Sequence, residues 1–323
     1  MTNFYADRGF GTMNNRKILV VAGPTAVGKT EYAIRLARTI GGEIVSADSM
    51  QIYKYMDIGS AKPTAEEQAA AKHWLVDEID PRTPFSAAEY CKMAKECIFD
   101  IFSRGKLPIV SGGTGLYVNS LIYDMDFSVS PKDDALRSKY QQIAEEKGNE
   151  YLHSILADID EDAAARIHPN NVKKVIRAIE AAKSGKKIRP FEQSFQPVKD
   201  YGCVLIGLER PREELYDRIN RRVDLMLDAG LEEEIRRLMS MGLSSDDISM
   251  KGIGYKELID SMNGMYGREE AAELIKRNSR RYAKRQMTWF RRYPDIRWFT
   301  LSERDEDDHL EDILSYLREN GIG

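Results

Sequence analysis

The stretch Gly23-Pro24-Thr25-Ala26-Val27-Gly28-Lys29-Thr30 decides the fold of this 323-residue chain. It follows the apolar run Ile18 to Ala22 and precedes a segment, 31–40, whose apolar residues recur at helical spacing. A G-x-x-x-x-G-K-T run between a strand and a helix is typical of a phosphate-binding loop, or P-loop. Its backbone N–H groups attract phosphate oxygens, Lys29 adds a positive charge, and the Thr30 hydroxyl suits a magnesium ion. The loop predicts binding of a polyphosphate, a property that kinases, motor ATPases and GTPases share.

Further strand signals continue this pattern along the chain. Residues Glu43 to Ala47 and Pro108 to Ser111 each open into a polar or glycine-rich turn, as parallel strands do at their carboxyl ends. Residues Cys203 to Leu208 form another strand signal, and Pro211 then begins a long helix, because proline suits the first helical position. This order predicts an α/β fold, a P-loop NTPase-like parallel sheet flanked by helices.

The length of the chain favours a principal domain with a smaller second lobe. Between residues 126 and 200 the sequence changes to charged helical patterns, which include Asp133 to Lys147 and Val172 to Lys183. We therefore expect the first part of the P-loop core over 1–125 and an inserted, mostly helical lobe over 126–200. Residues 201–323 should return to the core and end in a helical, basic C-terminal region.

The overall composition is that of an ordinary globular protein, with 42% hydrophobic and 31% charged residues. The three cysteines show neither a zinc-site spacing nor a paired disulfide framework, which suits a reducing compartment. The apolar run near the start of the chain is too short to span a membrane, and nothing there reads as an export signal. We expect a cytoplasmic protein without a membrane partner, and a monomer.

Two more turns follow predicted strands. Asp48 comes directly after the second predicted strand, at the sheet edge where open α/β folds bind ligands. An aspartate there can hold magnesium, accept a proton from a nucleophile, or cap a helix. The run Gly112-Gly113-Thr114-Gly115 follows the third predicted strand, and its glycines allow close backbone approach unless it is a plain tight turn. Three such turns at one sheet edge favour a ligand site.

The long helix after Pro211 carries two arginines on one face, because Arg218 and Arg222 lie four residues apart. They could clamp an anionic phosphate. Pairing with the neighbouring Asp217 and Asp224 on a solvated face is the alternative.

The formal net charge of -4 conceals a basic block near the end of the chain. Residues 268–297 hold ten Lys/Arg against four Asp/Glu, whereas residues 301–323 hold two against eight. Within the basic block, Arg281, Lys284 and Arg285 belong to a cationic stripe that is interleaved with aromatic residues. This combination favours an RNA contact over a plain solvated face. The acidic tail from Glu303 to Asp312 has no functional explanation beyond keeping that end of the chain soluble.

Taken together, these residues resemble the tRNA dimethylallyltransferase family, the isopentenyltransferases that modify the adenosine immediately 3′ of the anticodon. The resemblance runs nearly end to end. Its motifs are Gly23 to Thr30, Asp48-Ser49-Met50-Gln51-Ile52-Tyr53, Met56 to Pro63, Gly112 to Tyr117, Gly252-Ile253-Gly254-Tyr255-Lys256 and Arg281 to Arg291. The family often has threonine where this chain has Ser60, a change that keeps the hydroxyl. No cysteine-histidine zinc module follows the basic helix, so the chain resembles bacterial members.

The resemblance implies roles for these residues. The P-loop would bind the diphosphate of dimethylallyl diphosphate, with a magnesium ion on Thr30, and Asp48 would be the general base toward the adenine N6. Thr114 would position the base or the leaving group, and Arg218 and Arg222 with Lys29 would stabilise the departing diphosphate. The inserted lobe and the basic helix would hold the anticodon stem-loop. Residues implied in tRNA binding are Asp48, Ser49, Met50, Gln51, Lys251, Gly252, Ile253, Gly254, Tyr255, Lys256, Arg281, Lys284 and Arg285.

Three other functions remain open on the residues alone. A P-loop small-molecule kinase would need the same loop but leaves the basic aromatic helix unexplained. A prenyltransferase acting on free AMP or ATP would need the loop and Asp48, but has less reason for the cationic C-terminal region. An RNA-binding protein without catalysis would not depend on Asp48.

Overall fold

The computed structural model describes residues 16–125, 133–186, 196–302 and 306–322. The chain divides into two compact units. The larger unit, which we call the core, comprises Met1–Ile122 and Val198–Gly323, and the smaller unit, the helical lobe, comprises Tyr123–Pro197. The lobe begins and ends slightly earlier than the inserted segment 126–200 expected from the sequence.

The core is built on a parallel six-stranded sheet with the order β3-β2-β4-β1-β5-β6. The strands are β1 (Lys17–Ala22), β2 (Gly42–Ser46), β3 (His73–Trp74), β4 (Leu107–Gly112), β5 (Gly202–Glu209) and β6 (Arg297–Thr300). The predicted strands correspond to β1, β2, β4 and β5. The edge strands β3 and β6 were missed because each is short and only partly buried, which leaves little apolar signal.

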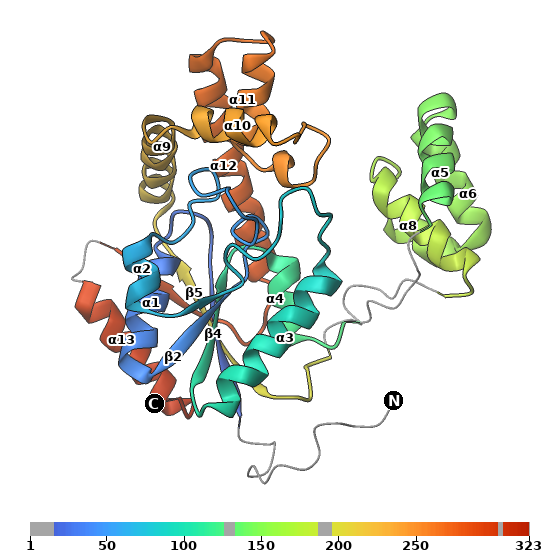
Figure 1. Ribbon diagram of the computed structural model, residues 1–323. Coiled ribbons are helices and arrows are strands. Elements are labelled where there is room, and N and C mark those ends of the chain that lie inside the picture. Colours follow the sequence, from blue (N-terminus) through green and yellow to red (C-terminus); the bar gives the residue numbers. More distant parts are fainter. Residues whose placement is uncertain (1–15, 126–132, 187–195, 303–305, 323) are drawn as a thin grey trace. The chain divides into compact units, whose positions relative to one another are not determined.

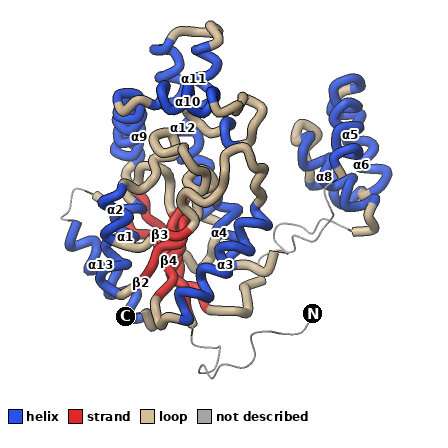
Figure 2. Tube along the Cα trace, viewed as in Figure 1, coloured by secondary structure: helices blue, strands red, loops and turns tan. Residues whose placement is uncertain are grey.

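Helices cover both faces of the sheet, with α1 and α13 on one side and α3 and α4 on the other (Figures 1 and 2). The core helices before the lobe are α1 (Lys29–Ile40), α2 (Ala65–Ala70), α3 (Ala87–Ser103) and α4 (Gly115–Ile122). Those after it are α9 (Arg212–Asp228), α10 (Leu231–Ser240), α11 (Tyr255–Met262), α12 (Arg268–Phe290) and α13 (Glu306–Glu319), with the short 3₁₀ helix η3 (Ser249–Lys251). The turns after β1, β2 and β4 therefore share one edge of the sheet, as predicted.

The acidic tail has a structural explanation that sequence reasoning did not find. Its second part forms α13, whose residues Ile313, Leu314 and Leu317 are buried in the same apolar cluster as α1. The acidic side chains Asp307 and Glu311 stay exposed. The helix is amphipathic, and its apolar face covers the sheet while its charges face water.

The helical lobe consists of α5 (Asp134–Lys147), α6 (Asn149–Ile159), α7 (Glu161–Arg166) and α8 (Val172–Lys183) around its own apolar cluster. On α8, Val175 and Ile179 are fully buried, whereas Lys173, Lys174 and Arg177 are exposed. The exposed side of α8 is therefore cationic. In the described part of the chain, no helix combines the length and apolarity needed to cross a bilayer.

Candidate active site

The P-loop connects β1 to α1, and glycine is required where it turns most sharply. Gly23 has φ 156° and Gly28 has φ 113°, both outside the region that L side chains favour. A Cβ on Gly23 would lie 2.6 Å from the carbonyl oxygen of Leu208. The Nζ of Lys29 donates to the carbonyl oxygen of Pro24 at 2.7 Å, so its charge lies inside the curve of the loop.

Two arginines from the segment that follows β5 hold the outside of this loop. The Nε of Arg210 donates to the carbonyl oxygen of Val27 at 2.9 Å. The Nε of Arg218 donates to the carbonyl oxygen of Ala26 at 2.9 Å. Arg218 therefore supports the loop backbone, and it is not among the residues that line the two pockets described below.

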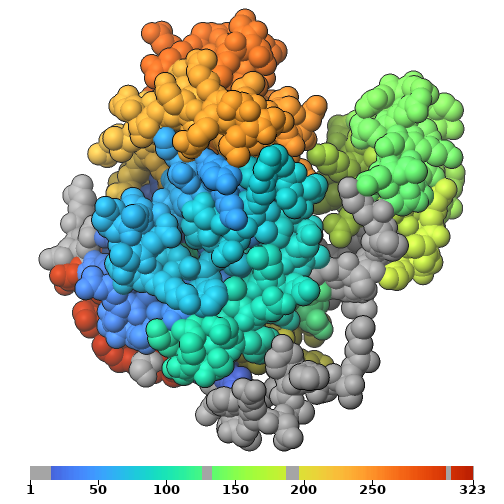
Figure 3. Space-filling model, in the orientation of Figure 1, coloured from blue at the N-terminus to red at the C-terminus, as the bar shows by residue number. Residues whose placement is uncertain are grey.

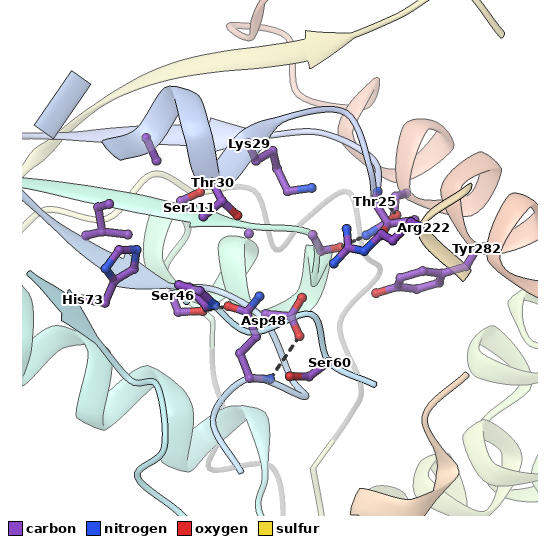
Figure 4. Close-up of a pocket in the computed structure, with 17 residues that line it drawn as sticks. Thr25, Lys29, Thr30, Ser46, Asp48, Ser60, His73, Ser111, Arg222 and Tyr282 are labelled. Atoms are coloured by element: carbon purple, nitrogen blue, oxygen red, sulfur yellow. Dashed lines mark hydrogen bonds between the residues drawn. The ribbon is translucent and has the colours of Figure 1, made fainter. Parts of the chain in front are cut away.

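A polar pocket opens beside the P-loop at the carboxyl edge of the sheet. Figure 4 shows the side chains of Lys29, Asp48, Arg222 and Tyr282 arranged around this cavity. Burial lowers the pKa of Lys29 to about 7, while the charge of Asp48 raises this pKa and that of Arg222 lowers it. The full lining consists of Thr25, Lys29, Thr30, Ala33, Ile44, Ser46, Asp48, Gln51, Ser60, Pro63, His73, Ser111, Gly112, Gly113, Arg222, Tyr282 and Gln286.

Asp48 lies in a turn rather than at a helix N-terminus. Its Oδ1 accepts the backbone N–H of Met50 at 2.8 Å, and residues 49–52 form turns, not a helix. The Oγ1 of Thr114 accepts the N–H of Ser49 at 3.0 Å, and the N–H of Thr114 donates to Ala47 at 3.1 Å. The two turns that sequence reasoning singled out are therefore joined, and Thr114 holds the Asp48 turn.

A second, more apolar pocket adjoins the polar one. Apolar and aromatic side chains form much of its wall, including Met50, Tyr53, Phe85, Tyr117, Ile219, Val223, Met226, Ile248, Ile253 and Ile275. Both pockets are lined by Thr25, Asp48, Ser60, Arg222 and Tyr282. The polar pocket therefore suits an anion, and the apolar pocket suits a flat or aliphatic group. The carboxylate of Asp48 and the guanidinium of Arg222 lie where the two pockets meet.

Arg222 differs from Arg218 in its surroundings. Burial lowers the pKa of Arg222, and the charge of Asp48 counteracts this effect. For Arg218, burial and the nearby Arg210 charge lower the pKa. Since guanidinium groups stay protonated near neutral pH, Arg222 presents a permanent positive charge to both pockets.

Several pocket residues on α12 were not predicted from the sequence, among them Tyr282 and Gln286. Tyr282 lines both pockets, and burial, assisted by the Asp48 charge, raises its pKa to about 12. Gln286 is buried, and its side chain bonds to Thr25 and Gly113. Both belong to the quoted motif of the basic helix. The motif thus contained both residues, but the cationic residues used to predict RNA contact lie on the opposite, exposed face of the helix.

The predicted tRNA-binding segment 251–256 contributes to the apolar pocket through Lys251, Gly252 and Ile253. Tyr255 is fully buried, and its hydroxyl donates to the Oε1 of Glu234 at 2.7 Å. Glu234 also accepts the backbone N–H groups of Asp57, Ile58 and Gly59 at 2.8, 2.8 and 3.1 Å. Figure 3 shows this region, in orange, resting on the blue loop that it holds.

The basic helix α12 uses its two sides differently. Arg281, Lys284 and Arg285 are exposed, and Arg285 reaches the wall of the apolar pocket. On the other side, the Nε1 of Trp289 donates to the Oδ1 of Asn119 on α4 at 3.1 Å. The aromatic side therefore packs against the core, while the cations stay available to an anionic partner.

The oxygen-bearing side chains of the polar pocket fit a magnesium ion. Hydroxyl groups of Thr30 and Ser111 and the carboxylate of Asp48 line the same cavity, and oxygen ligands are those that magnesium prefers. Among the described residues, no group of three or more His, Cys, Asp and Glu is placed to hold a metal ion. An ion at this site would therefore need phosphate oxygens and water to complete its coordination.

Comparison with known proteins decides the family. The family model described as IPP transferase matches residues 51–293. The chain belongs to this family. Two relatives named tRNA dimethylallyltransferase come from Alkaliphilus oremlandii and Clostridioides difficile. They are 52% and 50% identical to this protein, over 93% and 95% of its chain and 96% and 99% of their own length.

Solved structures agree with this assignment. The full-length tRNA isopentenylpyrophosphate transferase from Bacillus halodurans is 42% identical and has a TM-score of 0.72, with coverage of 95% of this chain and 96% of its own. A eukaryotic dimethylallyltransferase described as acting on tRNA is 26% identical with a TM-score of 0.78, over 94% of this chain and 79% of that one. The P-loop NTPase-like fold predicted from the sequence is confirmed.

Proposed function

We propose that this protein transfers the dimethylallyl group of dimethylallyl diphosphate to the exocyclic N6 of the adenosine that follows the anticodon (tRNA position 37). Diphosphate is the second product. The observation that carries this proposal is the position of Asp48 and Arg222, which line both the polar P-loop pocket and the adjoining apolar pocket. A base and a leaving-group cation at that boundary suit a displacement between a phosphate ester and a bound purine.

The donor would bind with its diphosphate in the P-loop pocket. The loop N–H groups, Lys29 and Arg222 are the donors and charges available there. As the bond between the allylic carbon and the diphosphate oxygen breaks, the bonding pair stays with that oxygen. Positive groups already in place stabilise this growing charge without reorganising, which is the largest single contribution in many enzymes. A magnesium ion at Thr30 would neutralise part of the same charge.

Asp48 would accept the proton that N6 loses as it bonds to the allylic carbon. The amine of adenine is a weak nucleophile because its lone pair is delocalised into the ring. General-base assistance typically contributes about 100-fold to 10,000-fold to such a step. The bonds from Thr114 to Ser49 and Ala47 fix the turn in which Asp48 lies, so the carboxylate is held before substrates arrive.

The acceptor adenine would enter the apolar pocket after leaving its stack in the anticodon loop. A base inside a stacked loop cannot bring N6 to a carboxylate inside a pocket, so extrusion of the base is required. Phe85, Tyr117 and Ile253 supply apolar surface for a purine ring. Lys251 and Arg285 at the pocket wall supply positive charge for the adjoining phosphates.

The rest of the anticodon stem-loop would contact the cationic surfaces of the two units. In the core these are Arg281, Lys284 and Arg285 on α12, and in the lobe they are Lys173, Lys174 and Arg177 on α8. Contacts of lysine and arginine to phosphates give affinity that falls steeply with salt. We further propose that the protein acts as a monomer in the cytoplasm, where its tRNA substrates are found.

The test is to incubate the protein with labelled dimethylallyl diphosphate and magnesium, together with bulk tRNA, AMP or ATP in separate reactions. Label in tRNA alone is expected. Label in AMP or ATP would support a free-nucleotide prenyltransferase, and phosphoryl transfer without movement of the isoprenoid would support a kinase.

A matched pair of variants tests the role of Asp48. Asp48→Asn is expected to reduce single-turnover transfer by about 100-fold or more while tRNA binding is retained. Asp100→Asn is the control, because Asp100 is an exposed aspartate on α3 that pairs with Arg104 and lies outside both pockets. An Asp48→Asn rate equal to that of the control would remove the base assignment.

A further inference from the structure

The side chain of Gln286 connects the P-loop to the turn after β4. Its Oε1 accepts the backbone N–H of Thr25 at 2.9 Å, and its Nε2 donates to the carbonyl oxygen of Gly113 at 2.9 Å. Only 5% of Gln286 is exposed, and its bond to Gly113 is buried. A Cβ on Gly113 would lie 2.1 Å from the Nε2, which means that only glycine permits this approach.

The glycine turn at the other end of this bridge supports the separate turn that contains the proposed base, Asp48. Thr114, the next residue after Gly113, bonds to Ala47 through its N–H and to Ser49 through its Oγ1. These two residues flank Asp48. Hydrogen bonds, together with the peptide bond between Gly113 and Thr114, therefore connect the P-loop through Gln286 to the turn of the base.

The sheet itself does not hold these two loops together. The paired register of β1 and β4 ends at Ala22 and Gly112, immediately before the P-loop and the glycine turn. Beyond that pair, the side-chain amide of Gln286 accepts a hydrogen bond from the P-loop and donates one to the turn after β4. It thus takes the place that a backbone peptide group would have between two strands. Because Gln286 comes from α12, this link depends on a helix far away in sequence.

We propose that Gln286 is a positioning residue that sets the distance between the diphosphate cradle and the general base. This inference rests on the proposed function. Gln286 bonds to the P-loop and to the glycine turn that supports the Asp48 turn, and a misplacement of about 1 Å at such a site can cost on the order of 100-fold in rate. Loss of the bridge should therefore lower the rate of transfer more than it weakens the binding of tRNA.

The first experiment compares Gln286→Ala with the wild type in single-turnover transfer at saturating donor and tRNA. A 10-fold to 100-fold lower rate is expected, with the Kd for tRNA changed by less than about twofold. Thr288→Ala is the control on the same helix, since its exposed Oγ1 bonds within α12, to the carbonyl oxygen of Lys284. A Gln286→Ala rate within threefold of the wild type would overturn the proposal.

A second variant separates positioning from simple loss of folding. Gln286→Glu keeps the oxygen that accepts from Thr25, but its ionised form cannot donate to Gly113. Burial raises the pKa of a carboxyl group, so protonation on moving from pH 8 to pH 6 would restore the donor. The ratio of variant to wild-type rate should rise at the lower pH, whereas a ratio that stays constant, or that follows only the melting temperature, would refute the positioning role. Failure of the wild type itself to label tRNA would count against the proposed function instead.

Discussion

The lowered pKa of Lys29 predicts that the proposed binding of diphosphate depends on pH, by an amount that can be calculated. In the free protein, burial lowers this pKa to about 7, so half of the molecules carry a neutral Lys29 at pH 7. A bound diphosphate places negative charge beside the ammonium group and raises its pKa. The complex therefore holds more protons than the free protein above pH 7, and affinity must fall as the pH rises.

The magnitude follows from the fraction of Lys29 that is protonated before binding. With a pKa of about 7, this fraction falls from one half at pH 7 to about one hundredth at pH 9. The dissociation constant of inorganic diphosphate should then increase roughly 50-fold over this range, since each pKa unit corresponds to about 1.4 kcal/mol. At pH 8, binding should take up about 0.9 proton through Lys29 alone.

Isothermal titration calorimetry in two buffers of different ionisation enthalpy measures this proton uptake directly. Lys29→Arg is the matched variant, because a guanidinium group stays charged over the whole range. The variant also corrects for protons that the diphosphate itself takes up. If the wild type and Lys29→Arg take up equal numbers of protons at pH 8, the argument that burial discharges Lys29 is refuted.

Three further predictions concern other parts of the molecule. Arg222→Lys should lower the single-turnover rate about 10-fold or more with little change in melting temperature, because Arg222 lines the polar pocket. Arg218→Lys alters a contact to the loop backbone and should mainly raise the KM for the donor. Equal kinetic profiles of the two variants would contradict this distinction. Charge reversal at Lys173 and Lys174 should weaken tRNA binding and reduce the slope of log K for tRNA against log salt concentration by about 2. Filter binding from 50 to 300 mM salt measures this slope, and an unchanged slope would exclude phosphate contacts at these two lysines. Glu234→Gln should destabilise the protein by about 1–3 kcal/mol in urea denaturation, because at least one backbone N–H of the 57–59 loop loses its acceptor on the buried Glu234 side chain. An unchanged midpoint would count against that anchoring role.

Local sequence was sufficient for the parts of the site that are continuous in the chain. The P-loop consists of eight successive residues, and its glycines and Lys29 shape the loop through the backbone of the same segment. Its position between β1 and α1 was therefore predicted. Asp48 and Gly113 were placed at the same sheet edge because parallel strands bring their carboxyl ends together. The helical lobe was also recognisable, since its amphipathic helices alternate charged and apolar residues.

The pairing of groups from distant segments was decided only by tertiary structure. The sequence left Arg218 and Arg222 equivalent, because spacing of four residues shows a shared face but not what each side chain meets. Packing of α9 against the loop turns Arg218 to a backbone carbonyl and Arg222 into the pockets. Gln286 similarly looks like any polar residue of a basic helix until the fold buries it between two loops. Chemistry carried by adjacent residues can be read from the chain, whereas chemistry that needs two segments in contact depends on which faces the core buries together.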